Sequence, residues 1–278
     1  MTPTLLAEIV DRAIAEDLAS GDVTTRLTVP EGRRSAADLV ARTACVFAGG
    51  EVFRKVFERI DPGVVVRDLV ADGTRLVAGQ VAAQIEGSSR SVLAAERMAL
   101  NFVQRLSGVA TLTARFVAAI PQGSKTRIAD TRKTTPGLRG LERAAVRAGG
   151  GANHRDDLGG GVLIKDNHIV AVGSVGDAVR RARAGAPHGL KVEVEVTSMA
   201  ELDEALAAGA DAVLLDNMDD DAVRAAARKI AGKALVEVSG GITIDRVPVL
   251  AAAGVDVVSV GALTHSAPAV DLALDFRS

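Results

Sequence analysis

Two of the four histidines in this 278-residue chain lie in one short stretch, GGGANHRDDLGGGVLIKDNH, at residues 149–168. His154 and Arg155 are adjacent there, and Lys165 follows the apolar run VLI. An arginine can bind a planar carboxylate through two donors, and a histidine can donate to an anion or move a proton. Lysine is rarely buried without a partner, so Lys165 is either a Schiff-base nucleophile or a fixed positive charge for an anionic ligand. The alternatives are a structural His154 and a surface ion pair for Arg155.

A second group of cations lies in TRKTTPG, residues 131–137, where Arg132 and Lys133 follow a predicted strand. The hydroxyl groups of Thr134 and Thr135 and free N–H groups at a helix start would complete an anion site there. The alternative is a solvated basic loop with a helix cap. Residues 125–165 contain nine Lys and Arg but four Asp and Glu, although the whole chain has a net charge of −2. This local excess suits a small anionic substrate, whereas the overall charge does not favour nucleic acid or a membrane surface.

Carboxylates and small residues end the later predicted strands. Glu195 ends KVEVEV and Asp216 ends AVLLD, where they could bind sugar hydroxyls, hold Mg²⁺ or act as acid and base. Glu193 faces the same side as Glu195 but lies further from the strand end, so it is the one expected to have a packing or ion-pair role. The turns SGGI and VGALTHS follow the last two strands, and their backbone amides could approach a phosphate closely.

Several other classes of site find little support in the sequence. The spacing of His154 and His168 matches no common metal motif, so a structural role is expected for His168. The single cysteine, Cys45, lies in an apolar run and is expected to be a small buried residue. Aromatic residues make up 2% of the chain, which argues against a stacking surface for single-stranded nucleic acid. No apolar run is long enough for a membrane helix and the N-terminus lacks a signal-peptide pattern, so a cytoplasmic location is expected.

The predicted elements that position these residues form two domains. Residues 1–115 combine an amphipathic helix at 4–18, short strands, and a long helical pattern expected to break near Ser107 and Gly108. This part is predicted to be an α+β domain. A C-terminal helix at 266–278 is expected to pack on it.

The rest of the chain, residues 116–265, repeats an apolar strand followed by an Ala-rich helix six times. This alternation indicates right-handed crossovers and a parallel sheet. Because polar residues fall at the ends of many strands instead of one switch point, a barrel mouth is favoured over an open doubly wound sheet. The predicted fold class is therefore α/β, an incomplete (β/α) barrel after an N-terminal α+β domain.

The ordered set of motifs resembles one known family. The motifs are TRKTTPGLR, AVRAGGGANHR, LIKDNH, VEVEV, LLDN, SGGI and VGALTHS, preceded by EDLASGDVTT and AERMALNFVQRLSGVAT. Together they cover nearly the whole chain and resemble quinolinate phosphoribosyltransferase, also called nicotinate-nucleotide pyrophosphorylase (carboxylating). The resemblance implies that quinolinate and phosphoribosyl pyrophosphate (PRPP) give nicotinate mononucleotide, pyrophosphate and CO₂ with Mg²⁺, in NAD biosynthesis. It also implies a homodimer or higher even oligomer with shared active sites.

The resemblance further implies roles for individual residues. Quinolinate would be bound by Arg132, Arg155 and Lys165, with His154 and Lys133 nearby and Arg97 contributed by the other subunit. The implied catalytic residues are Lys133, Lys165, Glu195 and Asp216, the last two of which would hold ribose hydroxyls or the metal. The remaining substrate-binding positions are Thr131 and, around the phosphate, Ser239, Gly240, Gly241, Gly261 and His265.

The sequence departs from the family pattern at two places. Arg143 and Ala144 occupy the usual positions of a Lys-Tyr pair, and the segment DDLGGGV is unusually rich in glycine. Three alternative functions are kept: a related protein of molybdenum transport, a Schiff-base barrel aldolase that uses Lys165, and a non-catalytic anion-binding protein. The intact LIKDNH motif argues against the first, because that group has it altered.

Overall fold

The computed structural model describes residues 1–277 and divides into two compact units. The first unit contains Met1–Ala114, Thr134–Gly150 and the C-terminal segment that begins at Leu263. The second unit contains Arg115–Lys133 and Gly151–Ala262. The segment Thr134–Gly150, which the sequence interpretation assigned to the barrel, thus groups with the first unit.

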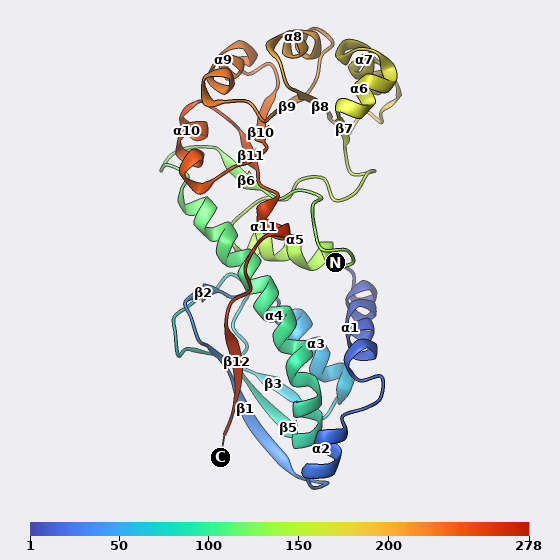
Figure 1. Cartoon of the computed structure of the whole chain (residues 1–278), viewed down its shortest axis with the longest axis vertical. Helices are drawn as coiled ribbons and strands as arrows, with labels where there is room; N and C mark the ends of the chain where they lie inside the picture. The colour runs from blue at the N-terminus through green and yellow to red at the C-terminus, as the bar shows by residue number, and fades with distance from the viewer. Residues whose placement is uncertain (278) are drawn as a thin grey trace. The chain divides into compact units, whose positions relative to one another are not determined.

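The first unit is built on a four-stranded antiparallel sheet with the order β12-β1-β5-β3. Its strands are β1 (Arg34–Ala41), β3 (Val65–Arg67), β5 (Val81–Ser88) and β12 (Leu272–Phe276), and β2 (Cys45–Val46) pairs separately with β4 (Arg75–Leu76). Its helices are α1 (Pro3–Asp17), α2 (Val23–Thr28), α3 (Gly50–Ile60), most of α4 (Ser89–Ala118), α5 (Arg139–Ala148) and most of α11 (Ala262–His265). Figure 1 shows α3 and α4 on one side of the sheet. Cys45 is buried, as predicted, and burial raises the pKa of its thiol.

The predicted C-terminal helix at 266–278 is wrong, because strand β12 occupies this part of the chain. β12 pairs antiparallel with β1, from Ala37 opposite Phe276 to Ala41 opposite Leu272. The sequence LALDF places an apolar side chain at every second position, which is the period of a strand with one buried face. The two-residue period thus prevails over helix propensity here.

The predicted break near Ser107 and Gly108 is also wrong, since α4 runs without interruption from Ser89 to Ala118. Gly108 instead allows a close approach of the chain: a Cβ atom at this position would lie 2.1 Å from the backbone oxygen of Pro268. The Ser107 hydroxyl accepts a hydrogen bond from the Ala48 N–H at 2.9 Å. Both residues therefore serve packing around the helix instead of ending it.

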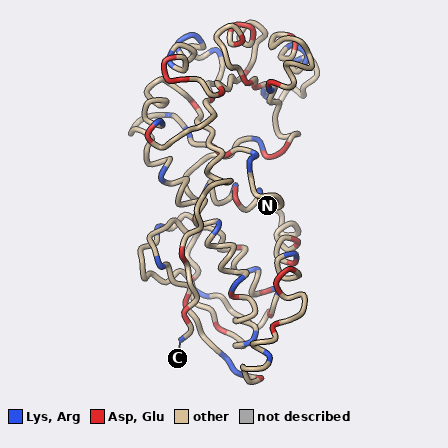
Figure 2. Tube along the Cα trace, in the orientation of Figure 1, with Lys and Arg blue, Asp and Glu red and all other residues tan. Residues whose placement is uncertain are grey.

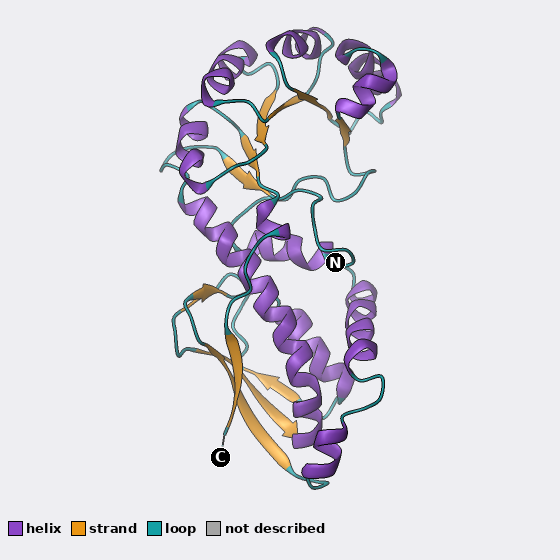
Figure 3. Ribbon diagram, in the orientation of Figure 1, coloured by secondary structure: helices purple, strands orange, loops and turns teal. Residues whose placement is uncertain are grey.

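The second unit contains a six-stranded parallel sheet with the order β6-β11-β10-β9-β8-β7. The strands are β6 (Arg127–Ala129), β7 (Val162–Ile164), β8 (Val192–Val196), β9 (Ala212–Asp216), β10 (Leu235–Ser239) and β11 (Val257–Ser259). The helices are α6 (Asp166–Val172), α7 (Val175–Gly185), α8 (Met199–Ala207), α9 (Asp220–Ile230), the short 3₁₀ helix η1 (Ile244–Arg246) and α10 (Val247–Ala252). Figure 3 shows the helices outside a curved row of strands that does not close. The predicted incomplete barrel is confirmed.

Local sequence explains why the helices of the second unit begin where they do. Ser174, Ser198 and Asp219 are the N-caps of α7, α8 and α9, and each side chain accepts a backbone N–H from the first helical turn. Such caps satisfy donors that the helix itself leaves unpaired. The strands between these helices are largely buried, and the helices cover one side of them. The side chains available for function therefore lie at the strand ends.

Candidate active site

A cavity of about 500 Å³ lies at the carboxyl ends of the strands in the second unit. Most of the site residues expected from the sequence line it, namely Thr131, Arg132, Lys133, His154, Arg155, Lys165, Glu195, Asp216, Ser239, Gly240 and Gly241. Parallel strands bring their carboxyl ends to one edge, so residues far apart in sequence meet there. The cavity therefore contains cations, carboxylates and a glycine turn together.

Arg132 and Arg155 are the guanidinium groups of the cavity. Burial, and then the positive charge of Arg132, lower the pKa of Arg155. Two like charges held near each other repel, and an anion bound between or beside them relieves that repulsion. This electrostatic arrangement suits a ligand with more than one negative charge.

The glycine-rich segment after Arg155 forms a turn that holds the arginine. The Asp157 carboxylate accepts the backbone N–H groups of Gly159 and Gly160, both at 2.8 Å. The next residue, Gly161, accepts a hydrogen bond from Arg155 Nη1 at 3.0 Å through its carbonyl oxygen. Added Cβ atoms at Gly160 and Gly161 would lie 3.8 and 3.7 Å from the Arg155 side chain. These are ordinary van der Waals distances, so the compact turn holds the arginine through hydrogen bonds and does not require glycine there for space.

Asp130 fixes the start of the same loop. It is fully buried at the end of β6 and accepts the His154 backbone N–H at 2.8 Å and an Asn153 side-chain N–H at 2.5 Å. A buried carboxylate needs such donors to offset its lost hydration. The Asn-His-Arg sequence is therefore held by a charge-assisted contact on one side of the loop.

Lys165 directly follows β7 and forms an ion pair with Glu195, which lies near the end of β8. The Lys165 side chain is 45% exposed and that of Glu195 11%. An ion pair with a carboxylate suits a fixed positive charge better than a Schiff-base nucleophile, which reacts as a free amine. The backbone N–H of Lys165 donates to His168 Nδ1 at 2.9 Å, so His168 has the structural role expected from the sequence.

Asp216 and the glycine turn after β10 are joined through Asn217. Asn217 adopts a positive φ of 53°, donates its side-chain N–H to Asp216 at 2.7 Å, and donates its backbone N–H to the Ser239 oxygen at 3.1 Å. Gly240 has a φ of 94°, and a Cβ atom there would lie 2.1 Å from Asn217 Oδ1. Gly240 is therefore required both by its backbone conformation and by the close approach of Asn217.

We expect Gly240→Ala to raise the KM about tenfold for PRPP, the sugar donor that the family resemblance implies, because the methyl group must displace Asn217 and with it Asp216. The matched control is Gly254→Ala, since Gly254 has a comparable φ of 85° with nothing within 4 Å of the added Cβ. Steady-state kinetics with varied PRPP measure the effect. Equal KM values in the two variants would mean that this contact has no bearing on the site.

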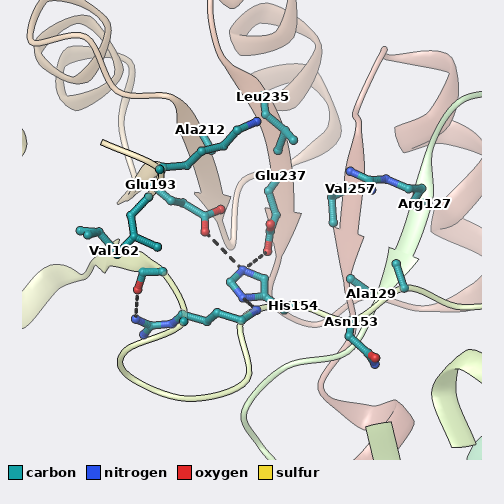
Figure 4. A pocket seen from close by; sticks show the side chains of 17 residues that line it. Arg127, Ala129, Asn153, His154, Val162, Glu193, Ala212, Leu235, Glu237 and Val257 are labelled. Atoms are coloured by element: carbon teal, nitrogen blue, oxygen red, sulfur yellow. Dashed lines mark hydrogen bonds and ion pairs between the residues drawn. The ribbon is translucent and has the colours of Figure 1, made fainter. Parts of the chain in front are cut away.

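The sequence interpretation did not assign a role to Glu237, which lies beside His154 in the sheet interior. His154 Nε2 lies 3.2 Å from Glu193 Oε2 and 3.4 Å from Glu237 Oε1 (Figure 4). Hydrogen bonds with these carboxylates raise the pKa of His154 to about 10, and burial raises the pKa of Glu193. Glu193 thus has the ion-pair role expected from the sequence. A glutamate in the apolar strand LVEVS was the signal that could have revealed Glu237.

These three side chains also lie close enough together to hold a metal ion. The donor atoms of His154, Glu193 and Glu237 all lie within 4.8 Å of one another. We interpret them as a hydrogen-bonded cluster, since His154 Nε2 is within reach of both carboxylates. Mg²⁺ prefers oxygen ligands, which makes Glu195 and Asp216 the better fit for the ion expected from the sequence.

Three of the residues predicted from the sequence to bind substrate do not line this cavity. Gly261 belongs to the second unit but does not line the cavity. Arg97 and His265 belong to the first unit, where the exposed His265 ring lies 2.6 Å from the Ser266 hydroxyl. The roles predicted for these three residues remain predictions.

Charge and hydropathy set further bounds on the protein. Figure 2 shows Lys and Arg interspersed with Asp and Glu along the trace of both units. Among residues 1–277, none of the helices combines the length and apolar character that a membrane span requires. Together, the incomplete barrel and its charged cavity define an α/β enzyme class that binds small anions at the carboxyl ends of parallel strands.

Comparisons with known proteins narrow this class. The model of the quinolinate phosphoribosyl transferase C-terminal domain matches residues 109–275, and that of the N-terminal domain matches residues 22–107. The chain belongs to the quinolinate phosphoribosyltransferase family.

Known relatives and solved structures are similar to this chain over nearly its full length. The nicotinate-nucleotide pyrophosphorylase (carboxylating) of Mycobacterium leprae is 44% identical over 96% of this chain and 96% of its own. The human protein of the same description is 40% identical over 99% of this chain and 92% of its own. The crystal structure of NadC from Streptococcus pyogenes is 41% identical, with a TM-score of 0.94 over 100% of this chain and 99% of that one.

Proposed function

We propose that the chain transfers phosphoribosyl from PRPP to quinolinate with loss of CO₂, and that the cavity of the second unit is where this occurs. The observation that carries the proposal is that three cations, Arg132, Arg155 and Lys165, line one cavity with the carboxylates Glu195 and Asp216. The family assignment supplies the reaction, nicotinate-nucleotide pyrophosphorylase (carboxylating) activity in NAD biosynthesis. The cavity supplies the chemistry that the reaction needs.

The cations suit quinolinate because it carries two carboxylates on neighbouring ring carbons. Arg132 and Arg155 can each offer a planar fork of donors, which matches a carboxylate in shape and charge. Lys165 adds a point charge near the carboxyl end of β7. Lys133 follows Arg132 directly and adds a further positive charge to the lining, which supports the binding of a second anionic substrate. Such a set favours a dianion over a ligand with a single carboxylate.

The carboxylates suit the sugar donor. As pyrophosphate leaves, positive charge develops at the ribosyl carbon, and a fixed negative charge nearby lowers the energy of that state. Glu195 and Asp216 can also accept hydrogen bonds from ribose hydroxyls. The turn from Ser239 to Gly241 offers small residues and backbone N–H groups for a phosphate. The cavity therefore has separate places for the base, the sugar and the phosphate.

The decarboxylation requires no basic residue. Transfer of the ribosyl carbon to the pyridine nitrogen gives that ring a positive charge, which stabilises the electron pair left at C2 when the C2–CO₂ bond breaks. C2 then takes up a proton to give nicotinate mononucleotide. The chain's part in this step is to hold the carboxylates while the ring nitrogen reacts.

Mg²⁺ is the cofactor that the family resemblance implies, and Glu195 and Asp216 are the residues that would hold it. Carboxylate oxygens of this kind fit an ion that is usually bound through one or two carboxylates together with substrate phosphates. When bound, Mg²⁺ would neutralise charge on the pyrophosphate. The His154 cluster fits less well, because an imidazole is a better ligand for softer metals.

The binding of quinolinate tests this proposal directly. The chain has no Trp or Tyr, so calorimetry is a better probe than intrinsic fluorescence. We expect quinolinate to bind at least about tenfold more tightly than nicotinate, which lacks the 2-carboxylate and loses one charge-assisted contact. Equal affinity for the two acids would contradict the proposed use of the cations.

We further propose a homodimer, or a higher even oligomer, in which Arg97 completes the active site of the partner. Arg97→Ala and Lys165→Ala would each be inactive alone, because each removes one cation from every site. After subunit exchange, mixed dimers contain one intact site, and about a quarter of the wild-type activity is expected from random mixing. Native mass spectrometry of differently tagged subunits establishes the exchange. Proven exchange without recovered activity would refute a shared site.

A further inference from the structure

Four side chains form a polar cluster in the sheet interior, and three of them, His154, Glu237 and Ser259, also line the candidate cavity. Apart from His154, they have no part in the proposed reaction. We call His154, Glu193, Glu237 and Ser259 the inner cluster. Glu193 is 9% exposed, Glu237 3% and Ser259 2%. Burial of two carboxylates costs free energy unless both are paired, and apolar residues at such positions often give a more stable core. The presence of these carboxylates in the sheet interior therefore calls for a functional explanation.

The contacts of the inner cluster lead from the strands to Arg155. Ser259 Oγ donates to Glu237 Oε1 at 2.6 Å, and His154 Nε2 lies 3.4 Å from the same oxygen. Glu193 Oε2 lies 3.2 Å from His154 Nε2. On the other edge of the ring, His154 Nδ1 accepts the Arg155 backbone N–H at 2.7 Å. The imidazole thus joins β8, β10 and β11 to the backbone of a proposed substrate-binding arginine.

Both ring nitrogens of His154 are engaged by groups of the chain itself. Because Nδ1 uses its lone pair to accept the Arg155 N–H, the ring proton in this arrangement lies on Nε2 and faces the carboxylates. Figure 4 shows the ring with Glu193 and Glu237 on one side. His154 therefore serves a ligand of the cavity through Arg155, not through a nitrogen of its own.

The inner cluster also separates two cavities. A second cavity, of about 570 Å³, lies at the amino ends of the strands and is lined by Arg127, Val162, Ala212, Leu235 and other residues (Figure 4). Among residues 1–277, those that line both cavities are His154, Arg155 and Glu237. Side chains between two open spaces have few packing neighbours, so their positions depend on hydrogen bonds. Arg155 is in this situation.

We propose that Glu193, Glu237 and Ser259 are positioning residues, which hold the Arg155 backbone through the His154 imidazole so that its guanidinium can bind a quinolinate carboxylate. This inference rests on the proposed function. It predicts that the three residues contribute to the affinity for quinolinate but not to the affinity for PRPP.

The experiment compares quinolinate and PRPP affinity in Glu237→Gln, Ser259→Ala, His154→Ala and His154→Asn by calorimetry, with the melting temperature of each. Asn at position 154 keeps an oxygen that can accept the Arg155 N–H in place of Nδ1. Glu204→Gln is the matched control, since it removes an exposed carboxylate of the same unit. Ser259→Ala is the mildest change and keeps the test valid if a buried glutamate variant does not fold.

We expect Glu237→Gln and His154→Ala to weaken quinolinate binding about tenfold, with PRPP binding changed less than about twofold. Ser259→Ala should show a smaller loss of the same kind, and His154→Asn should recover part of the affinity lost in His154→Ala. A parallel loss of both affinities with the melting temperature would show a general structural role and overturn the inference. Unchanged quinolinate affinity in folded variants would overturn it as well. Failure of the wild-type protein to bind quinolinate would instead refute the proposed function, and the inference with it.

Discussion

Replacement of Lys165 by methionine is expected to lower kcat/KM for quinolinate about a thousandfold. Methionine keeps an apolar stem of similar length but removes the ammonium group. The loss has two sources, the missing contact with a substrate carboxylate and the Glu195 charge, which then repels the substrate without compensation. The melting temperature should change little, because an ion pair whose lysine is 45% exposed contributes little to stability.

Lys229→Met is the matched control for this prediction. Lys229 also pairs with a carboxylate in the second unit, that of Asp203, with a similar exposure of 40%. It should leave kcat/KM within about twofold of the wild-type value, since surface charges far from a site act weakly in salt. Unchanged quinolinate affinity in Lys165→Met would refute the role assigned to this residue.

Removal of the Glu142 carboxylate in Glu142→Ala is expected to lower the free energy of unfolding by about 3 kcal/mol. The fully buried Glu142 accepts hydrogen bonds from Arg105 Nη2 at 2.9 Å and from the Thr135 hydroxyl at 2.7 Å. Its second oxygen accepts the Thr135 N–H at 3.0 Å. The alanine leaves the Arg105 charge and both Thr135 donors without this acceptor.

Chemical denaturation, monitored by far-ultraviolet circular dichroism, measures this loss. Glu58→Ala is the control, because Glu58 forms an exposed ion pair with Lys55 in the same unit and should cost less than about 0.5 kcal/mol. Glu142→Gln should lie between the two, since an amide oxygen can still accept one of the hydrogen bonds. A loss below 1 kcal/mol for Glu142→Ala would contradict the importance of this buried pair.

The arrangement of the candidate site could largely be predicted from the sequence. Lys165 follows an apolar strand, Glu195 and Asp216 lie near or at the ends of theirs, and parallel strands must bring such positions to one edge. These residues share one cavity because of the order of the strands in the sheet. The alternation of strands and helices leaves few possible orders. The glycine turn at Gly240 was recognisable for the same reason. These predictions rest on local patterns whose consequences are fixed by sheet geometry.

Other features depend on contacts between distant segments, which no local pattern reveals. Gly108 resembles a helix breaker, but its function is to admit the backbone of Pro268, a residue far along the chain. The two-residue period of the C-terminal segment indicates a strand only once β1 is known to be its pairing partner. Glu237 lies in an apolar strand, and only the tertiary structure shows that His154 faces it. Buried polar residues in predicted strands therefore merit examination even when they lie away from the strand end.

The most direct test of the central claim follows carbon and phosphorus together in one reaction. Quinolinate labelled with ¹⁴C in its 2-carboxylate is incubated with the purified protein, PRPP and Mg²⁺, and released ¹⁴CO₂ and pyrophosphate are measured over time. The account predicts equal amounts of both products, with no ¹⁴CO₂ when PRPP is omitted, because the C2–CO₂ bond breaks only after the ring nitrogen has been ribosylated. Release of ¹⁴CO₂ without PRPP, or no release of either product from quinolinate and PRPP, would contradict it.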